Sequence, residues 1–254
     1  MSSLDIVEAE HLQASNLFYR NPALYDSVQA DSDTVTVCRS LIDRHCPEAR
    51  TLLDFGCGTG RDLAQLAQHF DCVGVDLQPG LVHYVHRVRP RLDVRIGDMR
   101  TVRLGRTAEV LVCLGNSLAY VHDNQDIQSA FRTFAAHARP ESLLVLCSPV
   151  AAIEHSAPQQ ARVETHLGTA TVTIHYEWDL RTQINTMRRH WVFDSGEEAR
   201  DVIRRRVLGP RELELYAALA GFDIVEIISE SGATRLTGPE AYTVARYRAL
   251  SCLG

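Results

Sequence analysis

The stretch Leu52-Leu53-Asp54-Phe55-Gly56-Cys57-Gly58-Thr59-Gly60-Arg61-Asp62 decides the fold. Its first four residues are mostly apolar and predict a short buried strand. Three alternate glycines then predict a turn, because glycine accepts positive φ and lets a ligand approach the backbone closely. A helix should follow, since apolar residues recur at helical spacing at Ala64, Leu66, Ala67 and Phe70. The free N–H groups at the start of that helix would face an anion held over the turn.

Three interpretations of this turn compete. It is a tight turn without a ligand, a dinucleotide-binding turn, or a loop that binds S-adenosylmethionine (SAM). A dinucleotide turn requires G-x-G-x-x-G, but Arg61 stands where that pattern has its third glycine. An acidic residue in the strand followed by G-x-G-x-G closely resembles the SAM loop of class I methyltransferases. We therefore favour the SAM loop.

Composition narrows the choice of function. The 254 residues suffice for one large domain or for one domain with an insertion, and the net charge of −6 argues against nucleic acid as the main partner. No apolar stretch is long enough to span a membrane, and Met1 to Asp5 lack the pattern of a signal peptide, so we expect a cytoplasmic protein. No two of the seven cysteines stand at C-x-x-C spacing, so no metal site is predicted.

The sequence contains no lysine, and all 26 basic residues are arginine. This composition excludes a lysine Schiff base, and with it a pyridoxal-phosphate enzyme. It also excludes a P-loop, which requires a lysine for its phosphates.

Acidic residues lie at the end of the next predicted strand and just after the end of the one that follows it. Asp76 closes the strand 72–76, about twenty residues after the first glycine, where nucleotide folds place the acid that binds ribose hydroxyls. Its alternative role is to cap the helix that starts near Pro79. Asp98 and Met99 follow the strand 92–96 and are placed for an adenine ring, whereas the alternative for Asp98 is an ordinary turn residue.

The second half of the chain changes pattern twice. Residues 1–150 should form an N-terminal lid and the cofactor-binding core, with strands at 109–114 and 143–147 and a helix at 126–138. Alternating residues then predict antiparallel strands at 163–167, 171–176, 184–193 and 199–207, so 151–209 is interpreted as a β insertion that covers the acceptor. Residues 210–254 should complete the core with a helix from Pro210 and a strand at 222–228; periodicity leaves 242–250 undecided between strand and helix.

Residues 52–147 resemble class I SAM-dependent methyltransferases. The stretch 112–117 is similar to glycine N-methyltransferase, and the Tyr19–Tyr25 region and residues 97–100 are similar to the amino-sugar N,N-dimethyltransferases of macrolide biosynthesis. The resemblance implies a Rossmann-like α/β fold: a seven-stranded sheet with a reversed last strand, helices on both faces and an antiparallel β insertion after strand five. It also implies a set of cofactor-binding residues: Tyr19, Tyr25, Asp54, Gly56, Cys57, Gly58, Gly60, Asp76, Leu77, Asp98, Met99, Leu114 and Asn116.

The acceptor side is predicted from the same resemblance and from chemistry. Tyr120, His122 and Tyr25 are the candidate catalytic residues, because a neutral amine needs a partner for its hydrogen bond or proton. The candidate acceptor-binding residues are Tyr120, Trp178, Arg188 and Arg204, the last two for a carboxylate or phosphate. Glycine itself is a doubtful acceptor, because Ser148-Pro149-Val150 lacks the arginine that glycine N-methyltransferase carries there.

We therefore expect a SAM-dependent N-methyltransferase acting on a small molecule such as an amino sugar or amino acid. The alternatives are an O- or C-methyltransferase of natural-product biosynthesis, a catalytically silent SAM-binding module, and an NAD-dependent oxidoreductase. The sequence leaves monomer and homodimer open.

Overall fold

The computed structural model describes residues 15–29, 33–154 and 157–248. Five parallel strands come first along the chain: β1 (Thr51–Phe55), β2 (Asp71–Asp76), β3 (Asp93–Ile96), β4 (Ala108–Cys113) and β5 (Ala138–Pro149). β10 (Phe222–Ser229) and β11 (Glu240–Tyr247) complete a seven-stranded sheet of order β10-β11-β5-β4-β1-β2-β3. β11 runs antiparallel to both neighbours, so the predicted sheet with its reversed last strand is confirmed, and residues 240–247 are a strand.

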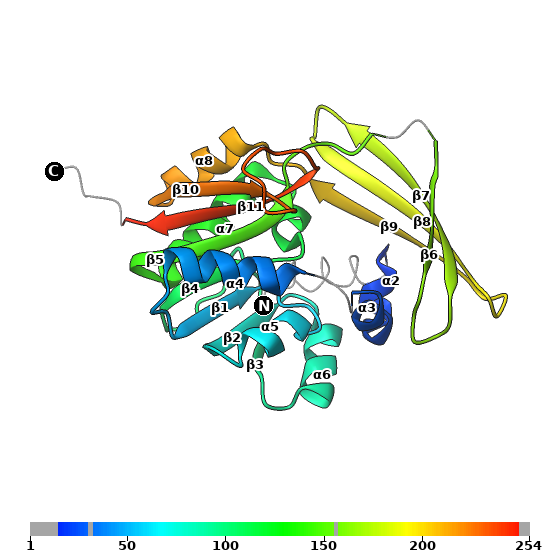
Figure 1. Cartoon of the computed structure of the whole chain (residues 1–254), viewed down its shortest axis with the longest axis horizontal. Coiled ribbons are helices and arrows are strands. Elements are labelled where there is room, and N and C mark those ends of the chain that lie inside the picture. The colour runs from blue at the N-terminus through cyan, green and yellow to red at the C-terminus, as the bar shows by residue number, and fades with distance from the viewer. Residues whose placement is uncertain (1–14, 30–32, 155–156, 249–254) are drawn as a thin grey trace.

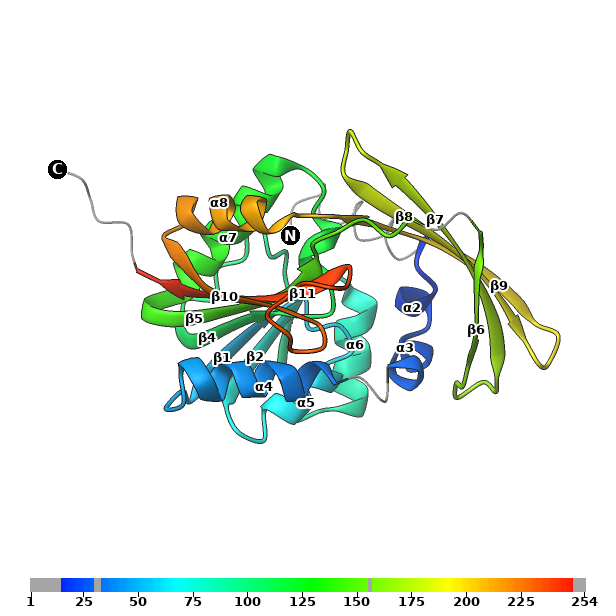
Figure 2. The same cartoon turned by 45° about the horizontal axis from the view of Figure 1, so that its top comes forward.

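Helices cover both faces of this sheet (Figure 2). One face carries α4 (Thr34–His45), α5 (Arg61–Leu66) and α6 (Pro79–Val88), and the other carries α7 (Asn124–His137) and α8 (Pro210–Leu219). Because both faces are covered, the central strands are almost continuously apolar, as in Leu52, Leu53 and Phe55 of β1. The short 3₁₀ helix η1 (Ser117–Tyr120) follows β4. None of the helices in the described ranges is long and apolar enough to cross a membrane.

A second, four-stranded antiparallel sheet is inserted after β5. It consists of β6 (Gln159–Val163), β7 (Ala170–Asp179), β8 (Ile184–Phe193) and β9 (Glu198–Arg206), in that order. The prediction of its first strand at 163–167 is wrong, because residues 165–168 form the turn into β7, with Gly168 at φ +100°. β6 was missed because its side chains are exposed at the sheet edge and show no apolar alternation.

Two short helices at the N-terminal end lie between the two sheets (Figure 1). α2 (Leu17–Arg20) and α3 (Pro22–Val28) meet at Asn21, whose side chain accepts a 3.1 Å hydrogen bond from the Leu24 N–H. Asn21 thus ends one helix and begins the next, immediately before Pro22. Phe18 and Leu24 pack on Trp191 and its neighbours in the insertion, so this segment is bound to the second sheet. Residues 1–14 of the predicted lid lie outside the described residues.

Candidate functional site

Three adjoining cavities, which share Gly56 and Ser117, open at the carboxyl ends of the parallel strands. This is the edge at which open α/β sheets bind ligands. We call them the Asp98-side, the Asp54-side and the Arg205-side cavity after one residue that lines each. The first two lie over the glycine turn and the ends of β1 to β3, whereas the third extends to β9 of the insertion and to β11.

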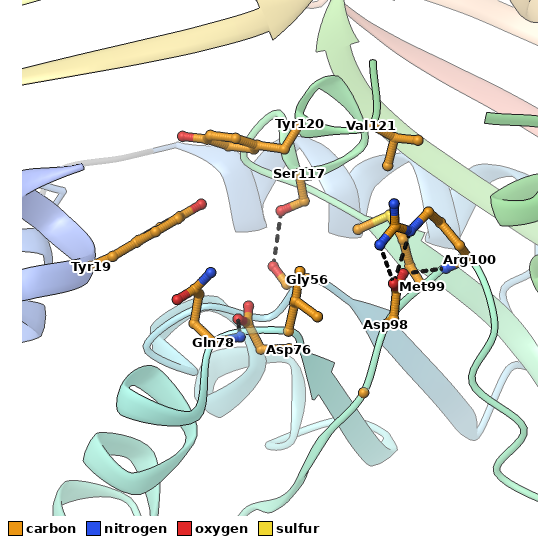
Figure 3. A pocket seen from close by; sticks show the side chains of 12 residues that line it. Tyr19, Gly56, Asp76, Gln78, Asp98, Met99, Arg100, Ser117, Tyr120 and Val121 are labelled. Atoms are coloured by element: carbon orange, nitrogen blue, oxygen red, sulfur yellow. Dashed lines mark hydrogen bonds and ion pairs between the residues drawn. The ribbon is translucent and has the colours of Figure 1, made fainter. Parts of the chain in front are cut away.

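The glycine turn is shaped by close contacts. A Cβ at Gly56 would lie 2.5 Å from the Cβ of Ser117, whose hydroxyl donates a 3.0 Å hydrogen bond to the Gly56 carbonyl (Figure 3). Gly58 has φ +57° and points its N–H at a carboxylate oxygen of Asp76, 2.7 Å away. Gly60 is different, because it lies at the start of α5 in the left-handed conformation and packs toward Val85 and Leu92. Gly60 therefore starts the helix and does not line the cavities.

Asp76 ends β2 in the shared wall of the Asp98-side and Arg205-side cavities. Its side chain also accepts the Gln78 N–H at 2.8 Å, and burial outweighs these two donors and raises the pKa of Asp76 to about 6. Each carboxylate oxygen retains a lone pair for a further donor. Next to it, both polar atoms of the buried Gln78 amide lack a hydrogen-bond partner among the described residues. Buried polar atoms are normally paired, so the Asp76–Gln78 wall is suited to bind a polar ligand.

Asp98, Met99 and Leu77 line the Asp98-side cavity together with Asp76, as the sequence predicted for one site. The Asp98 carboxylate is held by its neighbour: Arg100 donates from Nη2 at 2.6 Å, from Nε at 2.8 Å and from its main-chain N–H at 2.8 Å (Figure 3). Arg100 also reaches Asp126 at 2.8 Å. A ligand at Asp98 would therefore meet one half of an ion pair.

Asp54, Cys57, Gly58 and Leu114 line the Asp54-side cavity, again with Tyr25. Asp54 is 3% exposed, and its Oδ1 has no hydrogen-bond partner within the described ranges. Burial, reinforced by the nearby Asp62 and Asp76, holds the pKa of Asp54 well above its usual range. A cationic ligand would relieve this unpaired carboxylate.

Three tyrosines surround the cavities. The rings of Tyr19 and Tyr120 lie 5.8 Å apart, Tyr25 stacks on Phe18 at 5.0 Å, and Asn16 Nδ2 donates to the Tyr120 hydroxyl at 3.2 Å. Burial is the main cause that raises the pKa of Tyr19 and of Tyr25. Both phenols are therefore protonated at neutral pH, where they act as hydrogen-bonding groups and not as proton-abstracting phenolates.

Four predicted acceptor-side residues do not line these cavities. His122 lies beside the Arg204 main chain, with its Nε2 3.1 Å from that carbonyl oxygen. Arg188 pairs with Glu177 at 3.1 Å on the exposed face of the insertion, and Arg204 is also exposed. Trp178 lies near the end of β7 and is not a lining residue. For Arg204 the cause is the alternation of side chains along a strand. Ile203 and Arg205 face the Arg205-side cavity, so the side chain of Arg204 between them faces the other way.

Several residues that line the site were not predicted from the sequence. Ser117 and Gln78 follow predicted strand ends, and their position alone would have marked them. Arg205 could have been found by pairing it with the apolar Ile203 two positions earlier. Glu230 and Glu240 come from either side of the β10–β11 connection, and only the tertiary fold brings them beside Asn116 and Tyr120. Among the described residues, no group of three or more His, Cys, Asp or Glu side chains is placed to hold a metal ion.

Comparison with known proteins agrees with this geometry. A family model described as a methyltransferase domain matches residues 52–141. The chain is 34% identical over 108 residues to dTDP-3-amino-3,6-dideoxy-α-D-glucopyranose N,N-dimethyltransferase of Streptomyces fradiae, covering 42% of each chain. It is 31% identical over 140 residues to dTDP-3-amino-3,4,6-trideoxy-α-D-glucopyranose N,N-dimethyltransferase of Streptomyces venezuelae, covering 55% of this chain and 57% of that enzyme. The chain thus spans about half the length of these curated relatives.

Solved structures extend the likeness in fold to most of the chain. DesVI of Streptomyces venezuelae superposes with a TM-score of 0.75 at 23% identity, covering 87% of this chain and 94% of that one. SAM-bound CalS10, an amino pentose methyltransferase of Micromonospora echinaspora, gives 0.73 at 24% identity, covering 84% and 89%. Residues 52–141 therefore match a methyltransferase domain, and most of the chain shares the fold of these solved structures.

Proposed function

We propose that this protein transfers the methyl group of SAM to the nitrogen of a small acceptor, an amino sugar. The observation that carries this proposal is the shared wall of Asp76, Gly56 and Ser117, which joins a nucleoside-type pocket to a second cavity lined by the insertion. The three amino-sugar N,N-dimethyltransferases to which the chain is similar support the choice of nitrogen as the acceptor atom.

The residues present fit SAM. Asp76 has free lone pairs for two ribose hydroxyls, and the unpartnered Gln78 amide offers both a donor and an acceptor beside it. Met99 and the Asp98–Arg100 pair would border the adenine ring. The unpaired Asp54 oxygen lies near the glycine turn, where a positively charged methionine end would compensate it. When bound, SAM supplies an electrophilic methyl group on a sulfonium leaving group.

The protein's own residues then align the two reactants and keep water out of the site. The acceptor nitrogen attacks in line, the N–C bond forms as the C–S bond breaks, and the electron pair leaves on sulfur. Holding the two reactants in this alignment supplies much of the rate. Tyr19, Tyr25 and Tyr120, with α2 and α3, would exclude water from the cavities. The ammonium that forms loses its proton to bulk water once the cavity opens.

Tyr120 and Tyr25 keep their proposed role beside the reacting atoms, as hydrogen-bonding groups. His122 does not, because it lies outside the cavities on the Arg204 main chain. Among the arginines, Arg205 replaces Arg188 and Arg204 as the residue proposed to meet the acceptor.

The test is mass spectrometry of the purified protein with SAM and dTDP-3-amino-3,6-dideoxy-α-D-glucopyranose. The proposal expects the acceptor to gain one methyl group and then a second, and expects no gain on the analogue with a hydroxyl at position 3. Equal methylation of the hydroxyl analogue would show an O-methyltransferase. Binding of S-adenosylhomocysteine without turnover of either sugar, or of other amines and phenols, would show a silent binding module.

A further inference from the structure

Several polar side chains lie close together at the β11 end of the Arg205-side cavity. Glu240 begins β11 opposite Pro149, the last residue of β5, and Asn116 follows β4. Arg205 comes from the insertion, with its Nη1 3.6 Å from Oε1 of Glu240. The carboxyl ends of two parallel strands and the start of the reversed strand thus meet at one point, beside Tyr120.

Asn116 is unusual within this group in both its backbone conformation and its side-chain hydrogen bonding. It is one of few non-glycine residues in the left-handed region, with φ +66°, and its side chain is almost fully buried at 6% exposure. Its Nδ2 donates a 2.7 Å hydrogen bond to Oε1 of Glu240, which fixes the amide orientation. The other atom, Oδ1, has no hydrogen-bond partner among the described residues although it lines a cavity. A buried acceptor without a donor calls for a donor from a ligand.

The charges at this point favour the same kind of ligand. Glu240 and Glu230 both line the cavity, and burial together with the nearby Glu240 raises the pKa of Glu230. Opposed to them is one arginine, Arg205, whose Nε also lacks a partner within the described residues. Two carboxylates therefore face one guanidinium here, which leaves an excess of negative charge and of acceptor lone pairs. A ligand group that carries N–H bonds would match this excess.

We propose that Glu240 and Asn116 bind the amino group of the acceptor, and that each accepts a hydrogen bond from one of its N–H groups. This inference rests on the proposed function and adds to it the residues that select an amine over a hydroxyl. It also moves Asn116 from the cofactor, where the sequence reading had placed it, to the acceptor. Glu240 and Asn116 act as positioning residues, because the bonds that form and break lie on the nitrogen and the methyl group.

The geometry of an amine explains why two acceptors are useful. A neutral primary amine has two N–H bonds and one lone pair, so binding both N–H bonds leaves the lone pair free for the methyl group. Each transfer puts the methyl group on the lone pair and gives an ammonium ion, which then loses one N–H proton to water. Two transfers, each followed by this proton loss, therefore remove both N–H bonds. A neutral dimethylamine has no N–H bond left for Glu240 or Asn116 and is released. The Glu240–Asn116 pair therefore permits two transfers and favours release of the product after the second.

Arg205 offsets part of the negative charge of Glu240 at this site. A bare carboxylate beside an amine would stabilise the ammonium form, which has no lone pair and cannot attack. The guanidinium near Glu240 offsets part of that charge, so the site can hold the neutral amine. The same guanidinium lines the cavity together with Tyr120.

The test compares two probes: dTDP-3-amino-3,6-dideoxy-α-D-glucopyranose and dTDP-6-deoxy-α-D-glucopyranose, which has a hydroxyl in place of the amine. Their dissociation constants are measured by calorimetry with saturating S-adenosylhomocysteine, and their methylation by mass spectrometry. Glu240→Gln keeps the size of the side chain and an oxygen for Asn116, whereas Asn116→Gly removes Oδ1 yet allows the positive φ. Glu177→Gln, on the exposed face of the insertion, is the matched control.

We expect the wild type and Glu177→Gln to prefer the amine. Glu240→Gln should reduce that preference by about tenfold or more, and Asn116→Gly should reduce it and slow the first methylation, each with unchanged affinity for S-adenosylhomocysteine. Methylation by the wild type together with an unchanged preference in Glu240→Gln overturns the inference alone. A wild type that neither binds nor methylates the amino sugar overturns the proposed function, and the inference with it.

Discussion

The main-chain N–H of Gly58 donates a 2.7 Å hydrogen bond to Oδ2 of Asp76, which ties the glycine turn after β1 to the end of β2. Oδ1 of the same carboxylate accepts the Gln78 N–H at 2.8 Å. Asp76 therefore holds the two strand ends in register while its remaining lone pairs face the cavity. One side chain thus shapes the pocket and offers the binding groups within it.

Asp76→Asn is expected to weaken binding of S-adenosylhomocysteine by about 1.5–3 kcal/mol, because the ribose hydroxyls lose a charged acceptor. Calorimetry measures the change, and circular dichroism confirms that the variant is folded. Asp93→Asn, on the exposed start of β3, is the control and should bind like the wild type. An affinity equal to the wild type in the folded Asp76→Asn protein would remove Asp76 from the site.

The raised pKa of Asp76 predicts a pH dependence of binding. Only the ionised carboxylate accepts from both hydroxyls, so affinity for S-adenosylhomocysteine should be constant well above the pKa of about 6 and should fall below it, by up to about tenfold per pH unit. The same shift stabilises the fold as the pH falls from about 6 toward the ordinary value of 3.8, because the folded state then binds the proton more tightly. Weaker binding in this window is thus not unfolding caused by Asp76. Asp76→Asn should lose this pH step; a step that persists in the variant belongs to another group.

The N-terminal helices are expected to act as a lid held by a buried ion pair. Arg189 Nε donates to Asp201 at 2.9 Å, Asp201 Oδ2 accepts the Leu17 N–H at 3.0 Å, and the Arg189 guanidinium lies 4.3 Å from the Phe18 ring centre. Removing one charge of a buried pair costs about 3–5 kcal/mol. Asp201→Asn should therefore speed amide exchange over residues 15–29, whereas S-adenosylhomocysteine should slow exchange there in the wild type.

Asp194→Asn, which breaks only an exposed pair with Arg162, serves as the control for this experiment and should leave exchange over residues 15–29 unchanged. Protection by S-adenosylhomocysteine that appears in the glycine turn but not over residues 15–29 would show that the helices do not close over the cofactor.

Arg205→Met is expected to raise the KM for the amino-sugar acceptor and to leave the affinity for S-adenosylhomocysteine near that of the wild type. The reason is its position in the Arg205-side cavity, near Glu240. Arg188→Met and Arg204→Met should change neither quantity, since both side chains are exposed. Steady-state kinetics for the three variants decides the point. A raised KM in Arg188→Met or Arg204→Met, with Arg205→Met unaffected, would reverse the assignment.

Much of the fold follows from local patterns. The glycine turn and the strand-end acids Asp76 and Asp98 stand where strand and helix periods change, and those changes depend on neighbouring residues only. Much of the lining of the Asp98-side and Asp54-side cavities could therefore be predicted from the sequence. The ion pair of Asp98 with Arg100 was not evident, because side-chain pairing within a turn depends on its exact backbone path.

The acceptor side depends on contacts between distant parts of the chain. Arg204 and Arg205 are adjacent in sequence, and which of them faces the cavity is set by the register of β9 against β8 and by how the insertion sits over the core. Asn116 and Glu240 are 124 positions apart and meet only because β11 pairs with β5. No periodicity in either segment indicates such a meeting.

The central claim is methyl transfer to nitrogen, and the most direct measurement is NMR of the product made with SAM that carries a ¹³C-labelled methyl group. With dTDP-3-amino-3,6-dideoxy-α-D-glucopyranose as acceptor, we predict two labelled methyl carbons, both correlated to the sugar position that bears nitrogen. A labelled methyl on an oxygen or a carbon of the acceptor, or no label in the acceptor while S-adenosylhomocysteine still binds, would contradict the claim.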